Sequence, residues 1–224
     1  MPAGDSAWLI ELPDRLDAAV NARAIEIAAR IRGAQLGSVT DVVVGYRSVM
    51  VYVRPLVEAE QPVGPALQQI LSTAASPDLV AGPVVTVPVC YGGDLGPDLS
   101  AVAAFAALTP EEVVDRHAAR EYRVFMVGFV PGFAYMAEVD ATIAAPRRPT
   151  PRVRVPPGSV AIANAQTGIY PSATPGGWNI IGRTPLRPYD PGRSEPFLFR
   201  AGDRVRFRPI ALADYAASSE WGDI

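Results

Sequence analysis

The stretch FLFRAGDRVRFR, residues 197–208, indicates the fold class of the C-terminal half. Val205 and Phe207 alternate with arginines, as in a strand that buries one face. Ala201-Gly202-Asp203 is typical of a tight turn, so the stretch predicts a hairpin between strands at 197–200 and 204–208. Short strands bounded by Gly- and Pro-rich turns are also expected at residues 122–130, 159–163 and 178–182. Short strands at this spacing predict a closed or nearly closed β-barrel.

A pair of helices is expected ahead of these strands, at about residues 99–108 and 110–120. The second helix has a clear start, because Thr109 can cap it, Pro110 suits its first position and Glu112 completes a capping box. Asp98 is placed to cap the helix that begins at Leu99.

The first half of the chain alternates strand and helix signals. Strands are expected at residues 7–12, 39–44, 49–53 and 84–89, and helices at 16–32, where Gly33 should stop the first, and 63–75. The order β-α-β-β-α-β is that of a ferredoxin-like domain. We therefore expect an α+β fold with an N-terminal α/β domain over residues 1–83 and a barrel domain over residues 84–224.

Composition restricts the classes of function. The 224 residues carry a formal charge of −3, which argues against a nucleic-acid partner. No apolar run approaches the roughly 20 residues that cross a bilayer, and no basic stretch precedes the first apolar one. With Cys90 as the only cysteine, we expect a cytoplasmic protein without a membrane partner. The chain has no lysine, which excludes a Walker A loop and a lysine Schiff base.

Four segments place aromatic or polar side chains beside Gly and Pro: GFVPGFAY (128–135), APRRPTPR (145–152), QTGIYP (166–171) and TPGGWNIIGR (174–183). Gly and Pro fix backbone shape and allow close approach of a ligand. Tight barrel corners need the same residues, so the segments by themselves favour neither interpretation.

Arginines in and just after the second segment could hold a carboxylate or a phosphate by bidentate pairing. For Arg152 and Arg154 we favour the alternative of a solvated loop kept extended by prolines. Prolines also border Arg147 and Arg148, which makes these two the better candidates for an anion contact.

The known catalytic templates are incomplete in this chain. His117 is the only histidine, and a structural role on its helix is slightly favoured over catalysis. Cys90 could form a thiol-imidazole pair with His117, but it ends an apolar strand and is better explained as a buried residue. Asp94 and Asp98 could help to hold a metal or activate water, yet turn and cap roles are commoner. There is no GxSxG motif, and one His with one Cys cannot form a Cys/His zinc site. The missing site points to a separate partner protein.

The chain resembles the allophanate hydrolase subunit 1 family, which includes the B subunit of bacterial ATP-dependent 5-oxoprolinase and the sporulation-kinase inhibitor of spore-forming bacteria. The resemblance runs almost the whole length. Besides the four segments it includes GDSA (4–7), GYRS (45–48), VPVCYGGD (87–94), His117, VPPGSV (155–160) and GDRVRF (202–207).

The resemblance implies a cyclophilin-like barrel in the C-terminal domain. It also implies a subunit, inactive alone, of a multi-subunit ATP-dependent hydrolase acting on cyclic amides. The expected reaction converts 5-oxoproline, ATP and water to glutamate, ADP and phosphate. The expected partners are an allophanate hydrolase subunit 2-type protein and a third 5-oxoprolinase subunit. ATP is then a co-substrate of the complex, accompanied by Mg²⁺, and neither a tightly bound cofactor nor a metal site is expected in this chain.

The candidate site residues come from the matched segments. As catalytic residues we expect His117 and Arg148, the latter preferred to Arg147 only because it lies deeper in its motif. The expected substrate- or partner-binding residues are Phe133, Tyr135, Arg147, Gln166, Tyr170, Thr174, Gly176, Gly177, Trp178 and Arg183.

Three alternatives stay open. The chain could be a protein-binding regulator that inhibits a histidine kinase, which would need an exposed apolar face on the barrel. It could be an allophanate hydrolase component of urea degradation. A peptidyl-prolyl isomerase is the least favoured, because a shared barrel does not fix function.

Overall fold

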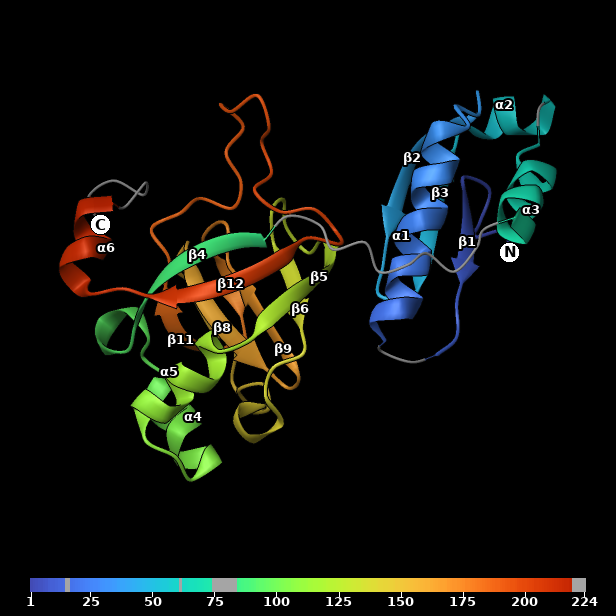
Figure 1. Cartoon of the computed structure of the whole chain (residues 1–224). Coiled ribbons are helices and arrows are strands. Elements are labelled where there is room, and N and C mark those ends of the chain that lie inside the picture. Colours follow the sequence, from blue (N-terminus) through green and yellow to red (C-terminus); the bar gives the residue numbers. More distant parts are fainter. Residues whose placement is uncertain (15–16, 61, 74–83, 219–224) are drawn as a thin grey trace. The chain divides into compact units, whose positions relative to one another are not determined.

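A computed structural model describes residues 1–14, 17–60, 62–73 and 84–218. The chain divides into two compact units, Met1–Ala81 and Gly82–Ile224. The first holds a small sheet with helices and the second a closed β-barrel (Figure 1), so the expected α+β class is confirmed. The expected boundary between residues 83 and 84 falls at the edge of segment 74–83, which lies outside the described residues.

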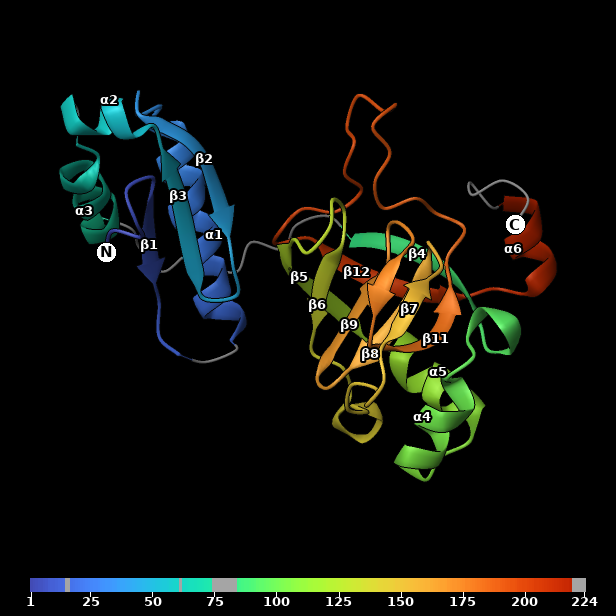
Figure 2. The ribbon, with the colours of Figure 1, turned by 180° about the vertical axis from the view of Figure 1, so that it is seen from behind.

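The N-terminal unit is an antiparallel sheet with α1 against one face (Figures 1 and 2). Its elements are β1 (Ala7–Glu11), α1 (Ala18–Gly33), β2 (Val39–Val44), β3 (Ser48–Val53), α2 (Pro55–Glu60) and α3 (Gly64–Thr73). The sheet order is β1-β3-β2. The Asp17 carboxylate starts α1 by accepting hydrogen bonds from the Ala19 and Val20 amides. The start expected for the first helix, at residue 16, and the end expected for the second, at residue 75, lie outside the described residues.

One strand of the ferredoxin-like pattern belongs to the other unit. Strand β4 (Val84–Tyr91) pairs in parallel with β12 (Arg204–Pro209) and antiparallel with β11 (Asn179–Arg183), both in the barrel. The expectation that this strand completes the N-terminal sheet is therefore wrong. Alternation of apolar residues identifies a strand but not the sheet that it joins.

The barrel closes in the order β11-β4-β12-β5-β6-β9-β8, with β8 pairing back to β11. Its other strands are β5 (Glu121–Val127), β6 (Ala134–Ala137), β8 (Ser159–Ala163) and β9 (Gln166–Ile169). A separate antiparallel pair, β7 (Arg152–Val155) and β10 (Thr174–Gly176), is not part of the closed ring. Short helices η1 (Gly93–Leu95) and η2 (Ala141–Ile143) and a final helix α6 (Leu212–Ser218) complete the unit.

The hairpin expected at residues 197–208 does not form. Its turn exists, because the Arg200 amide donates to the Asp203 carboxylate at 2.8 Å and the Asp203 amide to the Arg200 carbonyl at 3.1 Å. Strand β12 nevertheless pairs with β4 and β5, and Phe197 only bridges to Tyr189. The long-range ladder replaces the local one.

Helices α4 (Leu99–Ala106) and α5 (Pro110–Ala118) lie at one end of the barrel, as Figures 1 and 2 show. The capping box of α5 is confirmed: Thr109 Oγ1 accepts from the Glu112 amide and the Glu112 carboxylate accepts from the Thr109 amide. The cap expected from Asp98 is wrong. Asp98 occupies the N-cap position of α4, but its carboxylate makes no cap hydrogen bond.

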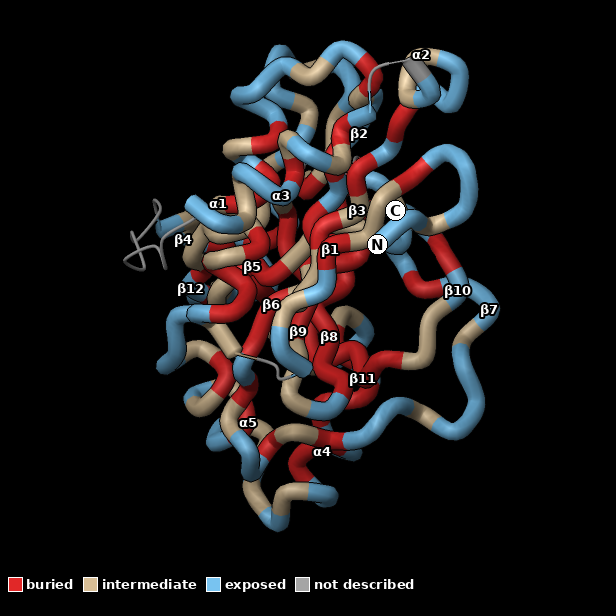
Figure 3. Tube along the Cα trace, turned by 90° about the vertical axis from the view of Figure 1, so that its right-hand side faces the viewer, coloured by how far each residue is buried: buried red, intermediate tan, exposed pale blue. Residues whose placement is uncertain are grey.

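Strand β8 is buried along its whole length, as its red colour in Figure 3 shows, and its two faces contribute to two apolar clusters. Val160 and Ile162 belong to the main core, with Val89, Met136 and Phe207 among its members. The alternate residues Ala161 and Ala163 belong to the second cluster, whose other members are Phe133, Val155, Tyr170, Trp178 and Ile180. Because side chains alternate along a strand, one strand supports two cores.

Two further findings concern the described part of the chain. None of its helices combines the length and the apolar composition needed to cross a bilayer. Within the same residues, no three side chains of His, Cys, Asp or Glu come together in a way that could hold a metal ion.

Candidate functional site

A cavity of about 310 Å³ opens over the second apolar cluster, and we call it the aromatic pocket. It is lined by Phe129, Phe133, Tyr135, Arg147, Pro151, Tyr170, Pro175, Gly176, Gly177 and Trp178. The volume is at the lower end of the range for small-molecule sites. Most of the side chains expected to bind a substrate or partner thus meet at one place.

Phe133 is the centre of the pocket floor. Its ring lies 4.7 Å from Tyr135, 5.1 Å from Tyr170 and 5.5 Å from Trp178, all in T-shaped contacts. Phe133, Tyr170 and Trp178 are almost fully buried. Edge-to-face packing of this kind fixes ring orientation, so the floor is preformed.

The backbone around the floor is shaped by one glycine and by one residue with an unusual conformation. A Cβ atom on Gly176 would lie 2.4 Å from the Tyr170 hydroxyl oxygen, so only glycine lets the ring approach. Phe129 has φ of +70° and is 60% exposed at the mouth, with its ring 5.8 Å from Phe133. A non-glycine residue held at positive φ is costly and is enriched at functional sites.

Arg147 supplies the positive charge of the pocket. Its guanidinium carbon lies 6.0 Å from the Trp178 ring centroid, within reach of a cation–π contact. Burial raises the pKa of Tyr135 and of Tyr170, and the charge of Arg147, which lines the same pocket, opposes both shifts. Among the described residues, Arg147 has no carboxylate partner, so it can accept one from a ligand.

Arg148, preferred by the sequence argument, lies outside this pocket. Its Nη1 donates to Asp98 Oδ1 at 2.7 Å, and its amide donates to the Gly177 carbonyl at 2.8 Å. Arg148 thus holds two loops together, whereas its neighbour Arg147 lines the cavity, so we take Arg147 as the better candidate for an anion contact.

Arg152 is also not a solvated loop residue. It lies in β7 and donates from both terminal nitrogens to Asp98, at 2.8 Å each. Asp98, with a side chain only 5% exposed, also accepts from the Ile180 amide at 2.7 Å. We call Asp98, Arg148 and Arg152 the Asp98 cluster. It ties the start of α4 to β7 and β11, which explains why Asp98 does not cap its helix.

His117 lies in the barrel core, remote from solvent. Its Nδ1 is 2.8 Å from the Tyr91 hydroxyl, and its Nε2 is 2.9 Å from Thr167 Oγ1, which itself donates to the Ala161 carbonyl. The ring stacks on Phe207 at 4.5 Å. Burial lowers the pKa of His117 to about 3. The histidine is neutral with both nitrogens occupied, an environment that fits the structural role rather than the catalytic one.

The remaining candidates are also placed away from the aromatic pocket. Cys90 is buried, which raises its pKa, and the ring nitrogens of His117 are taken by Tyr91 and Thr167 rather than by this thiol. Gln166 lies in β9 and Thr174 in β10, and neither lines the cavity. Arg183 lines a different cavity, described below.

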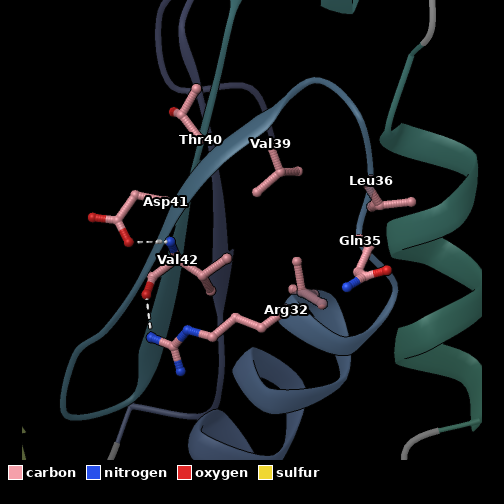
Figure 4. A pocket seen from close by; sticks show the side chains of 8 residues that line it. Arg32, Gln35, Leu36, Val39, Thr40, Asp41 and Val42 are labelled. Carbon is pink, nitrogen blue, oxygen red and sulfur yellow. Dashed lines mark hydrogen bonds between the residues drawn. The ribbon is translucent and has the colours of Figure 1, made fainter.

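A cavity of about 260 Å³ in the N-terminal unit, shown in Figure 4, lies between the end of α1 and β2. The Arg32 guanidinium donates to the Val42 carbonyl, and the Asp41 carboxylate accepts from the Val42 amide. Both charged groups already bind the neighbouring backbone, so this cavity offers a ligand less than the aromatic pocket does.

Two residues have places that the sequence did not predict: Phe129, which was not named as a site candidate, and Asp98, which was named only for a metal, water or cap role. Phe129 is part of GFVPGFAY, and a signal was present: a large aromatic residue directly after Gly in a turn is a poor choice for a solvated corner. Asp98 as the centre of an ion-pair cluster had no local signal, because its arginine partners follow it by 50 and 54 positions.

The fold and site define a member of a carboxyltransferase family. The protein-family model described as "carboxyltransferase domain, subdomain C and D" matches residues 1–199 of the sequence. The chain therefore belongs to that family. It is 38% identical to the 5-oxoprolinase B subunit of Bacillus subtilis (strain 168), over 97% of this chain and 95% of that protein. The corresponding B subunit of Escherichia coli O157:H7 is 38% identical over 92% of this chain and 93% of its own length. The resemblance found in the sequence motifs is thereby confirmed.

Solved structures give the same result for the fold. The structure of TTHA0988 matches with a TM-score of 0.81 and 36% identity over 92% of this chain, which spans only 40% of that longer chain. PH0987 from Pyrococcus horikoshii matches with a TM-score of 0.58 and 39% identity over 96% of this chain and 98% of its own. Kluyveromyces lactis urea carboxylase shares the fold at 18% identity and a TM-score of 0.78.

Proposed function

We propose that this chain is the B subunit of a multi-subunit 5-oxoprolinase and that its aromatic pocket receives the substrate. The observation that carries the proposal is the 38% identity to a 5-oxoprolinase B subunit over nearly the full length of both proteins. The likeness to urea carboxylase lies at 18% identity and concerns the fold alone, so it gives no support to a role in urea degradation.

The chemistry of the pocket suits a small lactam that carries a carboxylate. The apolar rings of Phe133 and Trp178 offer flat surfaces to a five-membered ring, and Arg147 at the mouth offers a bidentate partner to the carboxylate. Gly176 and Gly177 bring the backbone close to the same space.

The same pocket lacks a group that could activate water. Its described lining contains no carboxylate, histidine, cysteine or hydroxyl other than the phenols of Tyr135 and Tyr170, and burial raises the pKa of both above the ordinary value. A general base should titrate near the working pH. The chain therefore binds and orients the substrate, and partner proteins supply the rest of the active site.

The expected partners are a subunit 2-type protein and a third subunit. TTHA0988 carries further sequence beside the region like this chain, which makes up only 40% of its length, and this supports a second component. In the proposed complex, ATP with Mg²⁺ is a co-substrate, and its hydrolysis drives opening of the lactam to glutamate.

Reconstitution tests this assignment. The chain is purified alone and with its subunit 2-type and third-subunit partners, and glutamate formation from 5-oxoproline is measured with and without ATP. We expect turnover only in the complex and only with ATP. Steady turnover by the single chain, or a complete complex without glutamate formation, would contradict the proposal.

A further inference from the structure

A second cavity, of about 210 Å³, lies on the same unit and is built differently from the aromatic pocket. Arginines contribute the polar part of its lining: Arg152 and Arg154 from β7 and Arg183 from β11. Asp94, from η1 after β4, also lines it. We call this space the arginine cavity.

Arg183 is the informative residue. It is only 6% exposed, and its Nε donates to the Pro157 carbonyl at 2.9 Å. That is the single hydrogen bond of this guanidinium among the described residues, and no carboxylate there pairs with it. A charge taken out of water without a counter-charge is costly. A bound anion would supply the missing partner.

The charge around the cavity is unbalanced. Arg148, Arg152, Arg154 and Arg183 carry four positive charges, and Asp94 and Asp98 carry two negative ones, so the formal balance is +2. The single Asp98 carboxylate serves two guanidiniums, and Arg154 has no ion-pair partner in the described part of the chain. The excess matches a doubly charged oxyanion better than a single carboxylate.

The cavity wall is rigid. The Gly92 amide donates to the Ile181 carbonyl at 3.0 Å, and the Gly96 amide donates to the Gly92 carbonyl at 2.8 Å. A Cβ atom on Gly96 would lie 2.1 Å from the Ile181 carbonyl oxygen, so the turn that carries Asp94 must sit directly on β11. On the other side, the Ser159 hydroxyl donates to the Pro156 carbonyl at 2.8 Å and fixes the corner after β7.

We infer that the arginine cavity binds a phosphoryl group. Guanidiniums that reach it from β7 and β11 can contact several oxygens of a tetrahedral dianion, whereas a planar carboxylate is satisfied by one bidentate arginine. The volume of about 210 Å³ is below the usual range for ligand pockets, so the cavity itself has room for a phosphoryl group but not for a whole nucleotide. Phosphoryl binding is a property of the chain itself and does not depend on the proposed enzymatic role.

Calorimetric titration of the full chain with inorganic phosphate, at constant ionic strength, tests the site. Arg154→Ala removes an exposed arginine with little risk to the fold and should weaken phosphate binding about tenfold, as for one charge-assisted hydrogen bond. Arg183→Lys keeps the charge but loses the planar fork and should weaken binding as well. Asp94→Asn should tighten it severalfold by removing repulsion. Arg208→Ala, an exposed arginine of β12, is the matched control and should leave binding unchanged.

Acetate and ATP complete the experiment. Acetate should bind more weakly than phosphate, and acetate binding as tight as phosphate binding would overturn the phosphoryl assignment. Competition by ATP would identify the group as part of a nucleotide, and its absence would identify free phosphate or a simple monoester; either result supports the site. Phosphate affinity that is unchanged by Arg154→Ala and Arg183→Lys, or lowered equally by Arg208→Ala, would overturn the inference. Unfolding curves of each variant separate loss of binding from loss of fold.

Discussion

The aromatic pocket and the Asp98 cluster are built from the same short segment, residues 147–152, yet they use positive charge in opposite ways. In the cluster, Arg148 and Arg152 are paired with a buried carboxylate and tie three elements together. In the pocket, Arg147 lies over Trp178 and keeps its charge for a ligand. The difference teaches that the role of an arginine is not set by its place in a motif. It depends on whether the folded chain places a carboxylate close enough to pair with it.

The largest expected effect concerns the floor of the pocket. Trp178→Ala removes a side chain that is only 4% exposed and should lower the free energy of unfolding by about 3–4 kcal/mol. Urea unfolding measures it. Phe129→Ala, at the exposed mouth, is the control and should change stability by less than about 0.5 kcal/mol. If Trp178→Ala were as stable as the wild type, Trp178 would not be part of a packed pocket floor but of a surface patch.

The next effect tests the cluster. Asp98→Ala leaves two guanidiniums and the Ile180 amide without their partner and should cost about 3 kcal/mol, the low end for a broken buried pair because both arginines are partly exposed. Chemical unfolding of Asp98→Ala is compared with that of Asp115→Ala, which replaces an acidic residue of α5 outside the cluster. If the two variants unfolded at the same denaturant concentration, the cluster would be a surface ion pair of little consequence.

A smaller effect concerns the pH dependence of stability, because the fold keeps the buried side chain of His117 uncharged. Burial lowers the pKa of His117 to about 3, whereas an unfolded chain titrates near 6.5. Between about pH 6.5 and pH 3 the unfolded chain binds a proton at this histidine and the folded chain does not. The contribution of His117 to the free energy of unfolding is therefore greatest above about pH 6.5 and decreases as the pH falls. The expected loss between pH 7 and 5.5 is about 1 kcal/mol. His117→Gln should remove this dependence; an identical pH slope in the variant would place the titration elsewhere.

Local signals in the sequence predict much of the fold. The capping box at Thr109 and Glu112 needs only neighbouring residues, and the structure contains it at the predicted place. The alternation at Val205 and Phe207 identifies β12 but not its partners, since pairing with β4 across more than a hundred residues depends on barrel closure. The same limit explains why the strand at Val84–Tyr91 joins a sheet that its local pattern does not predict.

The candidate site follows the same rule. Gly- and Pro-rich segments with aromatic residues mark the loops that form the pocket, and Phe133, Tyr170 and Trp178 do meet there. Which arginine faces the cavity is decided by Asp98, a residue in another element that belongs to no recognisable motif. Ion pairs between distant positions are set by the assembled fold, so the choice between Arg147 and Arg148 requires the structure.

The most direct test of the central claim, that Arg147 rather than Arg148 meets the substrate carboxylate, is steady-state kinetics on the reconstituted complex with Arg147→Ala. We predict a KM for 5-oxoproline raised about tenfold or more, with the KM for ATP and the stability of the chain unchanged, because one charge-assisted pair is lost at an exposed position. Arg208→Ala provides the matched control. Wild-type KM and kcat in Arg147→Ala would contradict the claim and show that Arg147 is a solvated residue without a contact to the substrate.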